Sequence, residues 1–161
     1  MNKIFLLALL AFLLLPSTAS AEELADLLVE NVGNMHRVQL LTGDEAQAEV
    51  DKLHGKSLPA EASVVARYIA PGQKGGPAEV WISRVASAKE ARRQTGQMVH
   101  MMYENPRSPF KNPSRQDHGG NAVYRFEGMG QSHLIWFEAD LVYWISVASA
   151  GESAMLNTFC K

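Results

Sequence analysis

The sequence predicts an α+β fold, in which a single antiparallel sheet of five to six strands has helices packed mainly on one face. Two observations support this class. Three segments open with a helix-capping pattern, and six short segments are rich in the β-branched and aromatic residues that favour strands. Several strand segments are joined by short turns, so neighbouring strands must run antiparallel. This grouping of helices and strands is typical of α+β domains.

Three of the predicted helices begin at a capping box, in which a hydroxyl residue lies three positions before a glutamate. The hydroxyl oxygen accepts a hydrogen bond from the third helical amide, and the glutamate reaches back to the cap amide. These boxes cover residues 42–45, 87–90 and 149–152. The first helix is expected to end at Gly55 and the second before Pro106, because glycine and proline terminate helices. A fourth helix is expected over residues 23–32, where leucines recur with helical spacing.

The predicted strands cover residues 35–41, 64–69, 79–85, 121–127, 133–137 and 141–147. A segment rich in proline and glycine separates the second strand from the third, and a tight turn joins the last two. Both faces of these last two strands carry large apolar residues, so a sheet covered on one face would leave one set exposed. Either the N-terminal helix covers the second face, which we expect, or an apolar cleft remains there for a ligand or partner.

The first 21 residues have the pattern of a cleaved signal peptide. Lys3 gives a positive start, residues 4–15 are apolar, and small residues stand at Ala19 and Ala21, where a signal peptidase reads. The apolar run is too short to cross a membrane as a helix, which needs roughly 20 residues. We therefore expect residues 22–161 to form a single α+β domain that is periplasmic or secreted and has no membrane span.

Composition and charge argue against several classes of partner and chemistry. The net charge of −2 does not suggest a nucleic-acid partner. Because Cys160 is the only cysteine, no internal disulfide can form; the thiol is either buried and inert, as we expect, or paired with a second chain. The sequence has no G-x-S-x-G elbow, P-loop, dinucleotide motif or zinc-type spacing, so we predict neither a catalytic residue nor a cofactor.

Residues 105–120 show no secondary-structure pattern and are the first candidate for binding. Structureless loops of this length are uncommon in compact domains and are often functional or disordered. The residues that carry chemistry here are Arg107, Phe110, Lys111, Arg115 and His118. We interpret the segment as an anion- or partner-binding loop with Phe110 as an apolar anchor. The competing interpretation is an ordinary mobile loop.

The closing pair of strands is the second candidate because it is strongly aromatic. We assign Trp136 and Trp144 on these strands as ligand or partner contacts. Paired aromatic residues on a sheet also serve as core or cross-strand packing, so the assignment depends on which face stays open.

Residues 98–102, Met-Val-His-Met-Met, form the third candidate, because thioether and imidazole groups suit Cu(I). Helical spacing turns Met98 and Met102 toward the core and His100 toward the polar side, which favours core packing as the competing interpretation. A metal or haem site would have to be assembled from distant segments. Its candidate ligands are His54, His100, Met101 and His133.

Several short phrases of the chain resemble uncharacterised exported bacterial proteins. They lie at residues 41–46, 53–56, 78–83, 130–133 and 142–146. Such families are similar in size and carry a leader or a lipoprotein signal. The resemblance implies no activity and no catalytic residue, but it directs attention to the segments that contain His54 and His133.

The leader pattern and the two candidate binding surfaces together favour an exported, soluble binding or accessory protein without catalysis of its own. Its small-molecule ligand or protein partner is unknown. It would act through the aromatic strands and the basic segment 105–120. The alternative is a periplasmic protein that handles copper or haem through the histidines and the methionine named above.

Overall fold

The computed structural model describes residues 18–54 and 59–161. The signal-peptide prediction falls mainly on residues 1–17, outside the described residues, as does the predicted helix end at Gly55. Four α-helices are described: α1 (Thr18–Ala25), α2 (Gly43–His54), α3 (Ala88–Glu104) and α4 (Glu152–Phe159). A 3₁₀ turn, η1 (Ser149–Gly151), leads into α4. None of these helices is long and apolar enough to cross a membrane.

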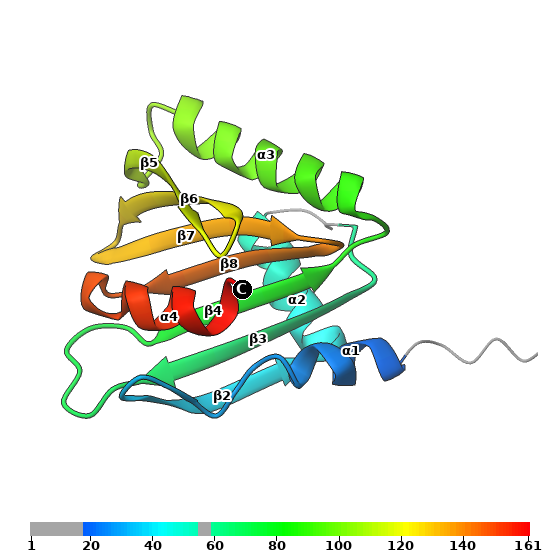
Figure 1. Cartoon of the computed structure of the whole chain (residues 1–161), viewed down its shortest axis with the longest axis horizontal. Helices are drawn as coiled ribbons and strands as arrows, with labels where there is room; N and C mark the ends of the chain where they lie inside the picture. Colours follow the sequence, from blue (N-terminus) through cyan, green and yellow to red (C-terminus); the bar gives the residue numbers. More distant parts are fainter. Residues whose placement is uncertain (1–17, 55–58) are drawn as a thin grey trace, which may run out of the picture.

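The strands form one antiparallel sheet in the order β1-β2-β3-β4-β8-β7-β6-β5 (Figure 1). Their bounds are β1 (Asn31–Val32), β2 (Met35–Thr42), β3 (Ala62–Ile69), β4 (Ala78–Arg84), β5 (Lys111–His118), β6 (Asn121–Gly128), β7 (Gln131–Glu138) and β8 (Leu141–Val147). Pairing of β4 with β8 joins the first half of the chain to the last, and Trp81 lies opposite Trp144 in that register. The α+β class and the single antiparallel sheet are confirmed. The predicted five to six strands are too few, because the sheet has eight.

The first missed strand is β1, which lies inside the helix predicted over residues 23–32. The helix ends at Ala25 instead. Gly33 then adopts a φ of +58°, which allows a tight turn and lets Val32 pair with Met35. Burial of Val32 and Met35 in the core favours this hairpin over continuation of the helix.

The second missed strand is β5, which corrects the predicted loop over residues 105–120. Seven of its eight residues are exposed, because β5 is an edge strand with no covered face. An alternating apolar pattern is therefore absent. Pro113 is tolerated at this edge because the register shifts between Lys111 and Ser114, where Asn112 takes a φ of +52°.

Helices cover both faces of the sheet, which corrects the prediction of one main helical face. Figure 1 shows α4 in front of the sheet and α2 behind it. Val64 and Ala66 of β3 belong to the core under α1 and α4. Val65, between them, packs with Ala46 and Val50 of α2 instead. Both faces need cover because alternate strand residues are apolar on each side.

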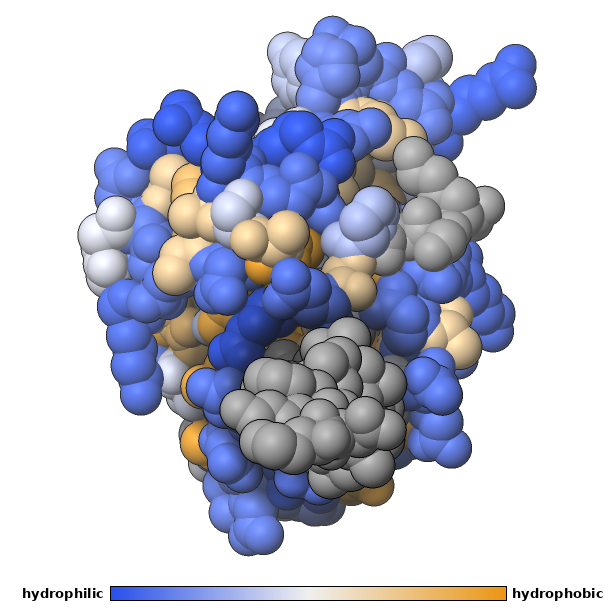
Figure 2. Space-filling view, turned by 90° about the vertical axis from the view of Figure 1, so that its right-hand side faces the viewer, coloured by the Kyte–Doolittle hydropathy of each residue, from blue (hydrophilic) through white to orange (hydrophobic). Residues whose placement is uncertain are grey.

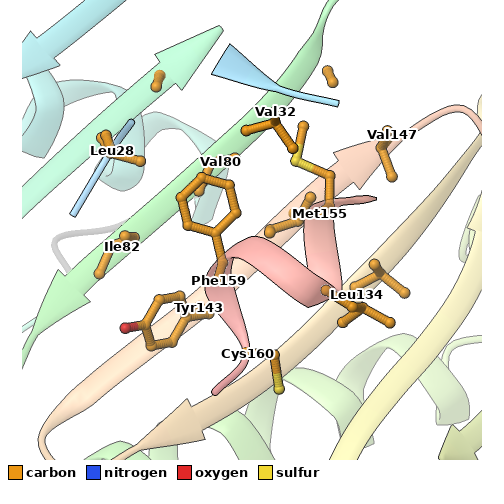
Figure 3. Close-up of a cluster of buried hydrophobic side chains, with 14 of the residues drawn as sticks. Leu28, Val32, Val80, Ile82, Leu134, Tyr143, Val147, Met155, Phe159 and Cys160 are labelled. Carbon is orange, nitrogen blue, oxygen red and sulfur yellow. The ribbon is translucent and has the colours of Figure 1, made fainter. Parts of the chain in front are cut away.

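The larger core lies on the face covered by α1 and α4. Figure 3 shows Met155 and Phe159 of α4 over the sheet residues Val80 and Leu134. Leu24 of α1 is completely buried in the same core. The expected cover of this face by the N-terminal helix is therefore found, with α4 sharing it. Seen from the side in Figure 2, the outer surface is mainly hydrophilic, with smaller apolar areas between.

Cys160 follows α4 and is buried in this core. Its Sγ lies 3.3 Å from the carbonyl oxygen of His118. Burial raises the pKa of the thiol, so the reactive thiolate is disfavoured. The geometry agrees with the expected buried, inert cysteine.

Candidate functional site

A cavity of about 630 Å³ opens between α2, α3 and the sheet; we call it the α2–α3 cavity. Its apolar lining comes mainly from Leu53, Pro59, Met98, Met101, Phe110 and Trp144. The polar groups at its border include His54, Arg93, Gln94 and Gln97. The face of the sheet under α2 and α3 is thus only partly covered, and the remaining space has the size and lining of a ligand site.

The serine half of the predicted capping box is found at the first turn of α3, whereas the glutamate half is not, because the Glu90 carboxylate binds side chains of α3 instead. Ser87 Oγ accepts a hydrogen bond from the amide of Glu90 at 3.2 Å. The Glu90 carboxylate binds Arg93 through two hydrogen bonds, at 2.6 and 2.8 Å. Hydrogen bonding to Arg93 lowers the pKa of Glu90 to about 2, so the carboxylate stays charged at neutral pH. Arg93 is therefore held at the cavity border by an ion pair.

Two rings that line the cavity, Phe110 and Trp144, pack together with a third ring behind them, His133, and we call these three the aromatic floor. Phe110 meets His133 and Trp144 edge to face, with centroid distances of 4.8 and 5.7 Å. His133 and Trp144 are 6.1 Å apart in the same geometry. His54 of α2 approaches Trp144 from the other side at 6.5 Å. Edge-to-face packing of this kind holds each ring in one orientation.

A chain of hydrogen bonds fixes two of these rings. Trp144 Nε1 donates to Ser146 Oγ at 3.2 Å, and the Ser146 hydroxyl lies 2.9 Å from His133 Nδ1. His133 Nε2 lies 3.0 Å from the carbonyl oxygen of Gly128, which can only accept, so the ring proton is on Nε2. Burial lowers the pKa of His133 and favours the neutral ring. Both of its nitrogens are thus occupied within the fold.

His54 has one ring nitrogen committed and one facing a sulfur atom. Its Nδ1 lies 2.8 Å from the carbonyl oxygen of Val50, one helical turn earlier, and so carries the proton in the neutral ring. Its Nε2 lies 3.4 Å from Met98 Sδ of α3. The last turn of α2 therefore presents an imidazole lone pair to a thioether at the cavity wall.

Gln94 brings an unpaired acceptor to the cavity. Its Nε2 donates to the carbonyl oxygen of Pro59 at 2.9 Å and to Glu90 Oε1 at 2.8 Å. Because both partners can only accept, the orientation of the amide is fixed. Gln94 is 4% exposed, and its Oε1 has no hydrogen-bond partner within residues 18–54 and 59–161. A buried acceptor left unpaired costs about 1–3 kcal/mol.

The structure brings four of the sequence-predicted site residues together. Phe110, Trp144, His54 and Met101 all line the α2–α3 cavity. His133 lies directly beneath it in the aromatic floor. Sequence reasoning thus identified the aromatic side of the site. It missed Gln94 and Ser146. Its assignment of Met98 to core packing is confirmed, since Met98 packs against two core clusters, and the same residue also lines the cavity.

The other predicted residues lie elsewhere. Trp136 is fully buried on the opposite face, stacked on Tyr143 with centroids 4.6 Å apart. His100 is exposed on α3 and paired with Glu104 at 3.0 Å. The basic residues assigned to a loop do not line the cavity: Arg107, Lys111 and Arg115 are exposed, and His118 is half-buried at the end of β5.

Within the described part of the chain, no group of three or more His, Cys, Asp and Glu side chains has the arrangement of a metal site. Methionine, whose thioether can also bind a metal ion, is not one of these four residue types. Comparisons of the chain with protein-family models, with curated proteins and with solved structures returned no match. A functional proposal for this chain therefore rests on its own residues.

Proposed function

We propose that this protein binds a small, mostly apolar molecule in the α2–α3 cavity and acts as an exported binding or accessory protein without catalysis of its own. The observation that carries the proposal is the size and the mainly apolar lining of the α2–α3 cavity. The ligand that fits this lining has a mostly apolar body. Export is supported by the leader pattern of residues 1–21.

The size and lining of the cavity support a small-molecule ligand. A volume of about 630 Å³ lies within the range of roughly 300–1,000 Å³ that small-molecule sites occupy. Trp144 and Phe110 offer flat apolar surfaces, and Met98 and Met101 offer flexible ones that adapt to a ligand's shape. A few polar groups at the border would then orient the ligand.

Binding is favoured over catalysis because Arg93, Ser108 and the amide hydrogens of Gln94 are engaged within the fold. Arg93 is paired with Glu90. Ser108 Oγ accepts a hydrogen bond from the amide of Phe110 at 3.2 Å, which stabilises the turn before β5. Gln94 uses its amide hydrogens on Pro59 and Glu90, and offers only an acceptor. Such groups hold and orient a ligand without activating it.

A fluorescent apolar probe tests the proposal directly. Anilinonaphthalene sulfonate should bind the purified protein at a single saturable site. Gln97→Trp places a large ring at the exposed border of the cavity and should weaken binding about tenfold, which corresponds to about 1.4 kcal/mol. Arg92→Trp puts the same ring on an exposed position of α3 that does not line the cavity, and should bind as the parent does.

Two outcomes of this probe titration would contradict the proposal. Unsaturable probe binding, or equal binding by Gln97→Trp and the parent, would refute the cavity as the site. Protein purified from its natural source, denatured and extracted, should release a small apolar compound detectable by mass spectrometry. The same extraction from Gln97→Trp should release less of it.

A further inference from the structure

His54 and Met98 meet in a contact that a hydrogen bond does not explain. The proton of the neutral His54 ring is on Nδ1, where it is donated to Val50, so Nε2 carries a lone pair. The sulfur of Met98, 3.4 Å away, also has only lone pairs to offer. Two electron donors thus face each other at the wall of the cavity. A bound cation between them would satisfy both.

We propose that His54 Nε2 and Met98 Sδ, together with Met101 Sδ, bind a single Cu(I) ion at the α2–α3 cavity. Imidazole and thioether groups are the soft ligands that Cu(I) accepts and that hard cations avoid. This site differs in chemistry from the apolar ligand proposed above and does not depend on it.

The distance between the two donor atoms fits a shared metal ion. First-row metals bind imidazole nitrogen at about 2.0 Å and sulfur at about 2.3 Å. With the two donors 3.4 Å apart, these bond lengths give an angle at the metal of about 100°. That angle is slightly smaller than the tetrahedral value of about 109° and leaves room for a third ligand on the cavity side.

Met101 is the third ligand because it is placed beside Met98 and is not used in packing. The two methionines are three positions apart on α3, so their side chains are neighbours on one side of the helix. Met101 is 60% exposed and lines the cavity. Met102, in contrast, is buried against Phe126 and Ile135 and has a packing role.

The surroundings of the site favour a monovalent ion. No aspartate or glutamate is among the described residues that line the cavity, so no carboxylate is present to neutralise a divalent ion there. Trp144, 6.5 Å from the His54 ring, adds an apolar wall. The carbonyl oxygen of Val50 orients the imidazole from behind, as outer partners do at metal sites.

The structure changes the set of metal ligands expected from the sequence. His54 and Met101 stay in it, and Met98 joins it. His100 leaves it because it faces solvent and pairs with Glu104. His133 leaves it because Ser146 and Gly128 take both of its nitrogens.

Cu(I) titration against the chromophoric chelator bicinchoninate, without oxygen, tests the site. The purified protein should withdraw one equivalent of Cu(I) from the chelator, and Zn(II) should not compete. Met98→Leu keeps the shape and apolar character of the side chain but removes the sulfur. It should weaken Cu(I) binding about tenfold or more, as should His54→Gln.

Met129→Leu is the matched control, since Met129 is an exposed methionine in the turn between β6 and β7. It should bind Cu(I) as the parent does, and far-ultraviolet circular dichroism should be the same for all variants. Failure of the parent to withdraw Cu(I), or unchanged affinity in Met98→Leu and His54→Gln, would overturn the proposal. The anilinonaphthalene sulfonate assay separates the two proposals: loss of probe binding with retained Cu(I) uptake rejects only the apolar ligand, and the reverse rejects only the copper site.

Discussion

The hydroxyl group of Ser146 links two of the rings beneath the α2–α3 cavity. Its oxygen accepts a hydrogen bond from Trp144 Nε1. Its single proton is donated to His133 Nδ1, which carries no proton of its own. We expect Ser146→Ala to leave both partners unpaired and to lower the free energy of unfolding by about 1–3 kcal/mol. Urea denaturation measures this loss. Ser153→Ala, at an exposed position of α4, should leave stability within about 0.5 kcal/mol of the parent.

An equal unfolding free energy for Ser146→Ala and the parent would contradict this role. The same variant should also weaken anilinonaphthalene sulfonate binding, because Trp144 loses the bond that orients its ring. Retained binding with lost stability would mean that ring packing by Phe110, His133 and His54 is enough to hold Trp144 in place.

At the level of single residues, the sequence identifies the large side chains of the site and misses those whose role depends on a distant partner. Phe110 is recognisable as an isolated aromatic residue in a polar segment, and Trp144 as part of a strongly aromatic pair of strands. The role of Gln94 can be recognised only in the structure, where its amide hydrogens bind Pro59 and Glu90. A hydrogen bond between segments that are far apart in sequence leaves no local pattern.

Among the elements, α4 is joined to the sheet at its first residue by an ion pair, in addition to its packing in the large core. Arg125 of β6 binds both carboxylate oxygens of Glu152, the first residue of α4, at 2.8 to 3.1 Å. The hydroxyl of Ser132 also donates to this carboxylate. Hydrogen bonding from Arg125 is the main cause that lowers the pKa of Glu152. The capping box expected over residues 149–152 is not formed, because Arg125 and Ser132 use the glutamate instead.

This ion pair should make stability depend on pH in the acid range. A carboxyl group whose pKa is lower in the folded protein than in the unfolded chain stabilises the fold above the unfolded pKa, about 4.3. That contribution is lost as the pH falls through the lower, folded value. We therefore expect thermal unfolding temperatures to fall below about pH 4.5.

Glu152→Gln should flatten this dependence and lower stability at pH 7 by about 1 kcal/mol. Glu30→Gln, at an exposed position before β1, is the control and should follow the parent curve. A Glu152→Gln curve that is parallel to the parent between pH 5 and pH 3 would show that Arg125 does not stabilise the fold through this carboxylate.

Whether an element is visible in the sequence depends on how its environment is patterned. The helix predicted from residue 88 to about 103 is found as Ala88–Glu104, because its capping box and apolar stripe are both local. Strand β5 has neither signal, since it lies at an edge with both faces in solvent. Its backbone pairing with β6 defines it, and pairing has no signature in a polar segment.

For the molecule as a whole, the two faces of the sheet are packed differently. The face under α1 and α4 has one large, continuous core. The face under α2 and α3 has three smaller apolar clusters and the cavity beside them. The apolar character of both faces was visible in the closing strands. Which face would be filled and which would keep a cavity depends on where the helices dock, and that is a long-range property.

Two tryptophans, one on each face of the sheet, allow a test of whether one face mainly stabilises the fold and the other mainly binds a ligand. Trp136 of β7 is fully buried in the large core and stacked on Tyr143, whereas Trp144 of β8 is half-buried in the cavity floor. Trp136→Phe leaves a void among close-packed neighbours, so we expect a loss of about 1–2 kcal/mol in unfolding free energy with unchanged probe and Cu(I) binding. Trp144→Phe borders an existing cavity and should destabilise the fold less.

The same Trp144→Phe variant should weaken anilinonaphthalene sulfonate binding, because a smaller ring loses apolar contact and the hydrogen bond to Ser146. Urea denaturation and probe titration give an unfolding free energy and a probe affinity for each variant. We expect Trp136→Phe to change mainly the unfolding free energy and Trp144→Phe to change mainly the probe affinity. If Trp136→Phe weakened binding as much as Trp144→Phe, the large core and the cavity would respond as one unit. The separation of a stabilising face from a binding face would then be wrong.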